Sequence, residues 1–193
     1  MLFTLYTDGA CAGNGRAGAR ASFAMVVPVA GRAAVVRGPV QPRAYALDGL
    51  TLRADGPALA PSNNRGELLG IVHALLAVLS TLGACDGDVP FGGAEIVSDS
   101  LLCIRTLDEW LPARRARGTA HELKNMDLVG IAEALLARAR AKLPVRLTHV
   151  RSHRAAPARG SPGHAAWAGN DLADRQAALA GDEVETLDIE FVI

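Results

Sequence analysis

The chain has 193 residues, 50% of them hydrophobic, which suits a single globular domain with a substantial core. Its 20 basic and 20 acidic side chains give no net charge, and this excludes a protein that binds nucleic acid through an overall positive charge. Any such binding must come from local arginine clusters. The three cysteines are odd in number and lack metal-ligand spacing, which argues against a disulfide framework and against a zinc site.

Signals for membrane insertion and export are not visible in the sequence. No stretch reaches the roughly 18 consecutive apolar residues that cross a bilayer, and the opening MLFTLYTDG lacks the basic region and cleavage site of a signal peptide. The cysteine usage fits a reducing compartment. We therefore expect an intracellular, cytoplasmic protein that does not bind membranes and is a monomer.

The first part of the chain predicts an antiparallel meander. Leu2–Tyr6 is a short apolar strand that ends at Asp8, and a glycine-rich turn follows. Ser22–Val29 and Ala33–Val40 are two further apolar runs separated by a short turn, which is the pattern of a hairpin. Gln41–Pro61 contains several prolines and shows little periodicity, so we expect a long loop or insertion there.

The second part predicts helices that alternate with strands. Ser62 suits an N-cap, and the helix that follows should run to about Leu82. We then expect a strand at Ala94–Ser98, a helix at Ser100–Trp110, a linker PARRARG, a helix at Asn125–Lys142, a strand at Val145–Val150, a loop at Arg151–Ala168 and a helix at Asn170–Ala180. Strands joined through helices run parallel. The fold class is therefore α/β, with a five-stranded mixed sheet, three antiparallel strands then two parallel, flanked by helices.

The predicted domain occupies residues 1–181, and the segments 41–61 and 154–166 are loops or insertions within it. Residues 182–193 form either a short extra strand or a flexible tail. Arginines gather in the segment PARRARG and around the end of the fifth strand. Such clusters are more often ordinary solvated surface than nucleic-acid contacts, so they do not define a function alone.

Four carboxylates are candidates for one site. Asp8 and Asp99 each end a strand, and in open α/β sheets sites form beyond the carboxyl ends of strands. Glu67 heads an otherwise apolar helix stripe, and Asp174 shares a helical face with alanines, so both should point inward. Each alone could be a cap, a turn former or an ion-pair partner. Four converging carboxylates repel one another unless a cation neutralises them.

The chemistry of these acids indicates hard divalent cations. Carboxylate oxygens suit Mg²⁺, or Mn²⁺ in its place. Two such ions about 4 Å apart would support hydrolysis of a phosphodiester by activating water and stabilising the leaving oxygen.

The sequence resembles the type 1 ribonuclease H family. The segments that carry the resemblance occur in the family's order: YTDGACAGNGRAG, SNNRGEL, IVSDS, LKNMDLV and GNDLADRQA. Together they extend from Tyr6 to about Ala180, nearly the whole chain. The resemblance implies a ribonuclease H-like fold and endonucleolytic cleavage of the RNA strand of RNA-DNA hybrids by two metal ions, which leaves 5′-phosphate and 3′-hydroxyl ends.

The resemblance also implies roles for individual residues. The metal-binding and catalytic acids are Asp8, Glu67, Asp99 and Asp174; the last is the final aspartate of GNDLAD and is chosen over Asp171. The family's contacts to the 2′-hydroxyls and backbones of the hybrid would fall on Cys11, Asn14 and Asn64. The 2′-hydroxyl is the group by which a protein can distinguish RNA from DNA. Each has an alternative structural role. Cys11 could be a small turn residue, and the two asparagines could satisfy turn or helix-cap backbone groups.

A histidine that assists product departure is also implied, and two residues compete for this role. His153 directly follows the fifth strand, whereas His164 keeps the family's spacing to the final aspartate. His153 is preferred because the strand fixes the root of the loop, and His164 is the alternative. His149, inside the strand, is more plausibly structural, and His73 is a helix histidine.

Three rival functions are considered. Gly13 to Gly18 matches GxGxxG formally, but a dinucleotide-binding fingerprint must open a helix and this one precedes an apolar β-rich segment. A non-catalytic hybrid-binding module would not need all four acids. Another nuclease of the ribonuclease H-like superfamily remains an alternative, and the asparagine pair before Glu67 favours ribonuclease H over it.

Overall fold

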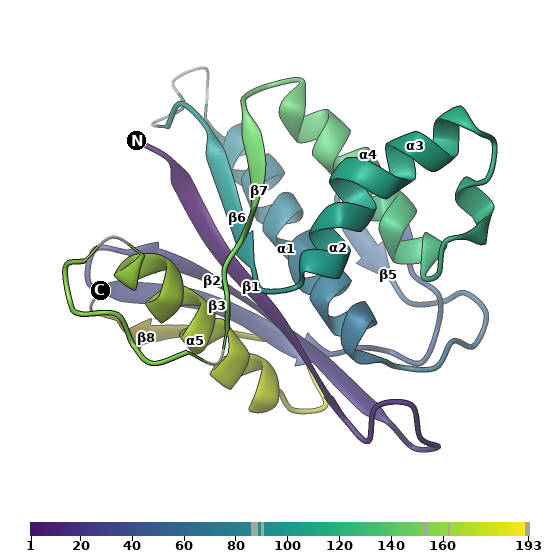
Figure 1. Ribbon diagram of the computed structural model, residues 1–193, viewed down its shortest axis with the longest axis horizontal. Helices are drawn as coiled ribbons and strands as arrows, with labels where there is room; N and C mark the ends of the chain where they lie inside the picture. The colour runs from purple at the N-terminus through teal and green to yellow at the C-terminus, as the bar shows by residue number, and fades with distance from the viewer. Residues whose placement is uncertain (86–88, 90, 153, 162, 192–193) are drawn as a thin grey trace.

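The protein is described by a computed structural model that covers residues 1–85, 89, 91–152, 154–161 and 163–191. A mixed sheet with strand order β7-β6-β1-β2-β3-β8 lies between helices on its two faces (Figure 1). Its strands are β1 (Phe3–Ala12), β2 (Arg20–Val29), β3 (Arg32–Pro39), β6 (Ala94–Ser98), β7 (Val145–His149) and β8 (Glu185–Glu190). The helices are α1 (Asn63–Ala84), α2 (Leu101–Arg105), α3 (Leu111–Ala116), α4 (Met126–Arg140) and α5 (His164–Ala178).

The predicted fold class is confirmed, because β1, β2 and β3 form an antiparallel meander and β1, β6 and β7 are parallel neighbours. The predicted count of five strands was wrong. The sixth strand, β8, lies in the segment 182–193 and pairs antiparallel with β3. Leu187 and Ile189 alternate with exposed Asp188 and Glu190, so the strand buries one face and leaves the other in solvent.

Strand β1 continues past Asp8 to Ala12, although the sequence predicted that it would end at the aspartate. Its two neighbours explain the difference. Parallel pairing with β6 stops at Thr7 and Ser98, whereas antiparallel pairing with β2 continues to Ala12 and Arg20. Asp8 therefore lies at the point where β1 no longer pairs with β6 but still pairs with β2.

Two other predicted boundaries differ, and the structure adds a turn before α4. The segment PARRARG was expected to be a linker, but most of it is helical. Helix α2 continues through a π-helical segment, η1 (Thr106–Trp110), into α3. A proline is tolerated in the first turn of α3, because N–H groups at the start of a helix have no helical partner. Helix α5 begins at His164 rather than Asn170, so the loop expected at 154–166 ends earlier. A 3-10 turn η2 (Ala120–Glu122) precedes α4.

The insertion at 41–61 contains a small hairpin, β4 (Ala46–Asp48) paired with β5 (Thr51–Arg53). It is attached by partly buried hydrogen bonds and by apolar contacts, since Tyr45, Leu47 and Leu52 pack with the larger core cluster. The backbone N–H of Gln41 donates to the hydroxyl of Tyr45 at 2.8 Å, and that of Tyr45 donates to Asp127 on α4 at 3.0 Å. The insertion is therefore an ordered part of the domain.

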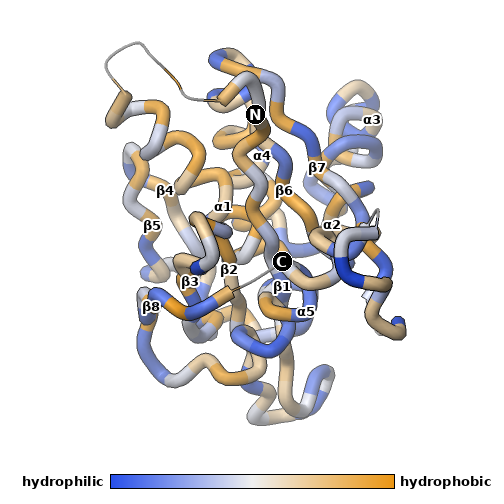
Figure 2. The backbone as a smooth tube through the Cα atoms, turned by 90° about the vertical axis from the view of Figure 1, so that its left-hand side faces the viewer, coloured by the Kyte–Doolittle hydropathy of each residue, from blue (hydrophilic) through white to orange (hydrophobic). Residues whose placement is uncertain are grey.

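The sheet has an apolar cluster on each face. The larger cluster packs Leu5, Phe23 and Ile96 against α1 and α4, and the smaller one packs Tyr6 and Val35 against α5. In Figure 2 the orange of hydrophobic residues is prominent along α1, β2 and β6. Helix α1 therefore serves as the main core helix on one face, and α5 is the helix that covers the other among the described residues.

Helix α1 corrects the prediction that no segment could cross a bilayer. By length and composition this helix qualifies, with a mean hydropathy of 1.8 over 18 residues. However, 61% of that window is buried inside the fold, where it packs on the sheet and on α4. Its hydrophobicity is thus accounted for by the core of the domain.

His73 provides a test of this core. Its ring stacks on Phe23 with centroids 4.3 Å apart, and burial lowers its pKa to about 4. Between pH 6.5 and 4, His73 is protonated in the unfolded chain but neutral in the folded chain. The free energy of unfolding that His73 contributes above pH 6.5 is therefore lost as the pH falls. We expect wild type to lose about 1–3 kcal/mol more unfolding free energy than His73→Leu between pH 7 and 4.5.

Urea denaturation at the two pH values measures this difference. His121→Leu, at an exposed position, is the matched control and should keep the wild-type pH dependence. Equal pH dependence in wild type and His73→Leu would contradict the prediction.

Candidate active site

Asp8 and Glu67 are brought together by a backbone contact between β1 and α1. A Cβ atom on Gly9 would lie 2.2 Å from the backbone nitrogen of Glu67, and one on Gly66 would lie 2.3 Å from the carbonyl oxygen of Ser22. Any side chain at either glycine would push the helix off the sheet. The two glycines thus allow the head of α1 to rest on β1 beside Asp8.

Asp99 completes the cluster from the next strand. It follows Ser98, the last residue of β6, which is the parallel neighbour of β1. Carboxylate oxygens of Asp8, Glu67 and Asp99 all lie within 4.8 Å of one another. The structure thus confirms the predicted convergence of these three acids, although Asp8 lies within β1 and not at its end.

The acids are buried and repel one another. Asp8 and Glu67 are each 4% exposed. Burial, reinforced by the charges of Asp99 and Asp174, raises the pKa of Asp8 to about 8. Burial and the charges of Asp8 and Asp99 likewise raise the pKa of Glu67 well above its ordinary value. Without a counter-charge, the folded protein thus disfavours full ionisation of this cluster.

Two oxygen atoms in the cluster fit a role as metal ligands. Asp8 Oδ2 and Glu67 Oε2 are buried and accept no hydrogen bond from the described residues. Their partner oxygens are held, since the Gly9 N–H donates to Asp8 Oδ1 at 2.7 Å and the Asn63 amide donates to Glu67 Oε1 at 3.4 Å. Each carboxylate is therefore oriented through one oxygen and leaves the other free for a hard cation such as Mg²⁺ or Mn²⁺.

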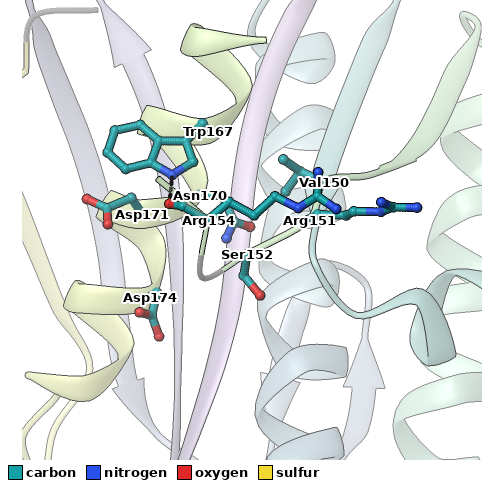
Figure 3. Close-up of a pocket in the computed structure, with 8 residues that line it drawn as sticks. All are labelled: Val150, Arg151, Ser152, Arg154, Trp167, Asn170, Asp171 and Asp174. Carbon is teal, nitrogen blue, oxygen red and sulfur yellow. Dashed lines mark hydrogen bonds between the residues drawn. The ribbon is translucent and has the colours of Figure 1, made fainter. Parts of the chain in front are cut away.

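Asp174 approaches the cluster from the other face of the sheet. It lies on α5, is half-buried, and is close enough for its charge to raise the pKa of Asp8. Figure 3 shows it on the turn below Asp171, in a small pocket whose opposite wall includes Ser152 and Arg154 from the segment after β7. Asp171 instead pairs with Arg175 at 2.9 Å. Asp174 is not part of the group of carboxylates within 4.8 Å of one another, so its place among the metal-binding acids stays a prediction.

Ser62 and Asn14 both lie at the N-terminus of α1. Ser62 occupies the N-cap of α1, but its side chain makes no capping hydrogen bond. Asn14 accepts a hydrogen bond from the Asn63 N–H at 3.2 Å instead. The glycine-rich turn thereby caps the helix that carries Glu67, which is the structural alternative considered for Asn14.

Cys11 and Asn64 line two different grooves. Cys11 is half-buried near the end of β1 and lines a groove with Ser22 and Ala178. Asn64 is exposed on the first turn of α1 and lines a second groove with Leu102 and Lys124. Both positions are accessible to a ligand that crosses the acidic cluster.

The two candidate histidines differ. His153 lies outside the described residues. His164 is 8% exposed, its Nδ1 is 2.9 Å from the carbonyl oxygen of Pro157, and its ring stacks near Trp167. The Trp167 indole in turn donates to the Arg154 carbonyl at 3.2 Å, the dashed line in Figure 3. His164 therefore holds the loop to α5, and this buried, bonded state does not suit a mobile group.

Three supporting residues were missing from the sequence-based set. Asn63 precedes Glu67 by four residues, which is the spacing that places two side chains on one helical face. Arg65, only 1% exposed, forms two hydrogen bonds to Asp127 at 2.9 and 2.8 Å and one to the Arg43 carbonyl at 3.0 Å. This network fastens the head of α1 to α4 and to the insertion. Arg65 and Asp127 both lie within the segments that carried the resemblance.

The arginine cluster on and after α3 is largely engaged in ion pairs. Arg114 pairs with Glu122 at 2.7 Å, and Arg115 forms a two-bond pair with Glu133. Arg117 donates to the carbonyl of Ala113. This region therefore presents less free positive charge than its sequence indicates.

A sequence model of the RNase H family matches residues 2–181. The chain belongs to the RNase H family. A curated relative named Ribonuclease H, from Methylorubrum extorquens strain PA1, is 32% identical over 187 residues. That match covers 95% of this RNase H family member but only 61% of the relative, so the relative is considerably longer.

Solved structures show the same fold. A type 1 RNase H with the type 2 active-site motif matches at a TM-score of 0.58 and 20% identity, over 97% of this chain and 77% of the other. The PFV RNase H domain matches at 0.53 and 17%, over 92% of each chain. The Prototype Foamy Virus protease-reverse transcriptase matches at 0.55 and 17%, over 94% of this chain and 21% of that one. At these identities the likeness concerns the fold.

The buried acids lead to a prediction about stability. Because the folded state raises the pKa of Asp8 to about 8, ionising it costs the folded protein stability as pH rises from about 4 through 8. We expect Asp8→Asn to raise the Tm of the metal-free protein by about 2–8 °C at pH 8 and to change it little at pH 4.

Thermal denaturation in EDTA at both pH values measures this effect. Adding Mg²⁺ at pH 8 should stabilise wild type more than Asp8→Asn, since the ligand binds only the intact cluster. A lower Tm for Asp8→Asn at pH 8 in EDTA would refute the proposed repulsion.

Proposed function

We propose that this protein hydrolyses the RNA strand of RNA-DNA hybrids endonucleolytically and leaves 5′-phosphate and 3′-hydroxyl ends. The observation that carries the proposal is the buried cluster of Asp8, Glu67 and Asp99 in a chain of the RNase H family, with two oxygens that accept no hydrogen bond within the described part of the chain. Converging buried carboxylates are costly without a cation, and a fold that maintains them is suited to metal-assisted hydrolysis.

The residues that would hold two Mg²⁺ ions are Asp8, Glu67, Asp99 and Asp174, and Mn²⁺ could take their place. When bound, these ions supply a water of lowered pKa and stabilise the charge on the leaving oxygen. The chain itself keeps the acids in place and excludes water. Asn63 and the Gly9 N–H each hold one oxygen of a carboxylate, which fixes the direction of the other.

Recognition of the RNA strand is proposed for Cys11, Asn14 and Asn64. They lie on β1, on the glycine-rich turn that follows it and on the first turn of α1, the two elements that carry Asp8 and Glu67. Asn14 is exposed while its side-chain oxygen accepts from Asn63, so its amide NH₂ remains available to donate to a 2′-hydroxyl. Asn64 offers both a donor and an acceptor from an exposed position. A 2′-hydroxyl, which both donates and accepts, matches these groups.

Cleavage of a labelled hybrid tests the activity. We expect Mg²⁺-dependent cutting of the RNA strand, with duplex DNA of the same sequence left intact. Asp99→Asn and Asp174→Asn should each lower the rate more than about 100-fold, because each removes a charged ligand. Asp171→Asn, three residues away on the same helix and paired with Arg175, is the matched control and should stay within about threefold of wild type.

Gel analysis of end-labelled substrates measures the rates and the end chemistry. Equal cutting of hybrid and duplex DNA would favour another nuclease of the superfamily. Tight hybrid binding without cutting would favour a non-catalytic hybrid-binding module. Wild-type rates in Asp174→Asn would remove that residue from the site.

The histidine in the loop after β7 is proposed to be His153, acting in product departure. His153→Ala should lower kcat about 10-fold under saturating substrate without changing Tm. His164→Ala should instead lower the free energy of unfolding by about 1–2 kcal/mol, since it loses its contact with the Pro157 carbonyl. Steady-state kinetics and urea denaturation separate the two effects. A kcat loss confined to His164→Ala would reverse the assignment.

A further inference from the structure

Helix α5 lies flat on the sheet, so its rotation about its own axis decides where the carboxylate of Asp174 is placed. Successive residues are about 100° apart around a helix. Ala173 and Ala177 are buried and face the sheet. Asp174 therefore falls on one flank of this buried stripe and Gln176 falls on the opposite flank. A contact that holds Gln176 limits the rotation that would move Asp174.

Gln176 is held by a single arginine from the sheet. Arg37 Nη1 donates to Gln176 Oε1 at 2.8 Å, and the Nε of the same guanidinium donates to Glu185 Oε2 at 2.9 Å. The Arg37 side chain is 16% exposed and the Glu185 side chain is 43% exposed, so the bonds are partly buried. Arg37 on β3 thus joins α5 to the first residue of β8.

Strand β8 supports the same flank with apolar contacts. Leu187, Ile189 and Phe191 pack against the cluster that contains Leu172 and Ala173 of α5. The register pairs Val35 with Leu187 and Arg37 with Glu185, so these side chains face the helix together. The C-terminal strand therefore forms part of the surface on which α5 rests.

Other contacts fix the axis of α5. Gly169 lies against the ring of Tyr6, where a Cβ atom would be only 2.4 Å from the ring, and Ser22 donates to the Ala177 carbonyl at 2.7 Å. These contacts set how closely each end of the helix approaches the sheet. A rotation of about 10° at a side-chain radius of about 5–6 Å would still move a carboxylate by about 1 Å. Productive sites require placement within about 0.5 Å.

We propose that Arg37 is a positioning residue for Asp174, acting through Gln176 and anchored by Glu185 of β8. The inference rests on the proposed role of Asp174 as a metal-binding acid. It gives the C-terminal strand a part in metal binding, because losing the Arg37 link would release one flank of the helix that carries the fourth acid.

The chain contains a matched control for this link. Arg32 joins the same two strands through Asp188, with an Nε to Oδ1 distance of 2.8 Å and a second bond to the Asp188 carbonyl. Arg32 lies five residues from Arg37, so the two side chains leave β3 on opposite faces. Arg32 therefore pairs β3 with β8 without contacting α5.

The test compares Arg37→Met, Gln176→Leu, the double variant and Arg32→Met in the full chain. Mn²⁺ binding without nucleic acid, followed by electron paramagnetic resonance, reports the site directly, and the Mg²⁺ concentration for half-maximal hybrid cleavage reports it during turnover. We expect about 10-fold weaker Mn²⁺ binding in Arg37→Met and Gln176→Leu. The double variant should be no weaker than Arg37→Met, since both act through one contact. Arg32→Met should stay within about twofold of wild type.

The outcomes separate this inference from the proposed function. Wild-type Mn²⁺ affinity in folded Gln176→Leu would overturn the inference, as would equal weakening by Arg32→Met. Additive losses in the double variant would also overturn it. If wild type binds Mn²⁺ but does not cut the hybrid, the proposed function fails while the Mn²⁺ comparison still decides the role of Arg37.

Discussion

The contact of Gly9 with the head of α1 is the constraint on which the rest of the site depends. It lets the first turns of α1 rest against β1. The backbone of Glu67 then touches the strand at Gly9, next to Asp8. Two carboxylates placed this way, with Asp99 beside them, repel each other in a site that burial makes poorly solvated. This repulsion destabilises the fold, and a bound divalent cation would neutralise the carboxylates and offset it.

The remaining structure maintains that arrangement from both faces of the sheet. On one face, Arg65 and Asp127 fasten the head of α1 to α4, and Asn14 caps its first turn. On the other face, α5 brings Asp174 toward the cluster, supported by β3 and β8. The four acids thus come from elements that pack in two separate apolar clusters. The sheet between the clusters fixes the position of each acid relative to the others.

Several features were predictable from the sequence because their causes are local. The apolar strands that precede Asp8 and Asp99, and the apolar stripe headed by Glu67, are readable as patterns of period two and of helical spacing. Boundaries set by distant partners were not readable. β1 passes Asp8 because β2 continues beside it. Ser62 occupies the predicted N-cap of α1, but the side chain that accepts from the first helical N–H is that of Asn14, from another segment.

The sequence by itself therefore determined the main strands and helices, the α/β class, and the convergence of Asp8, Glu67 and Asp99, since apolar strands and helix stripes follow from local periodicity. Only the tertiary structure decided that the C-terminal segment adds a sixth strand, that His164 is a buried contact of the loop, and that Arg37 connects this strand to the helix of Asp174. These depend on partners far away along the chain. Such contacts form through cooperative packing of the whole domain, and no short sequence pattern predicts them.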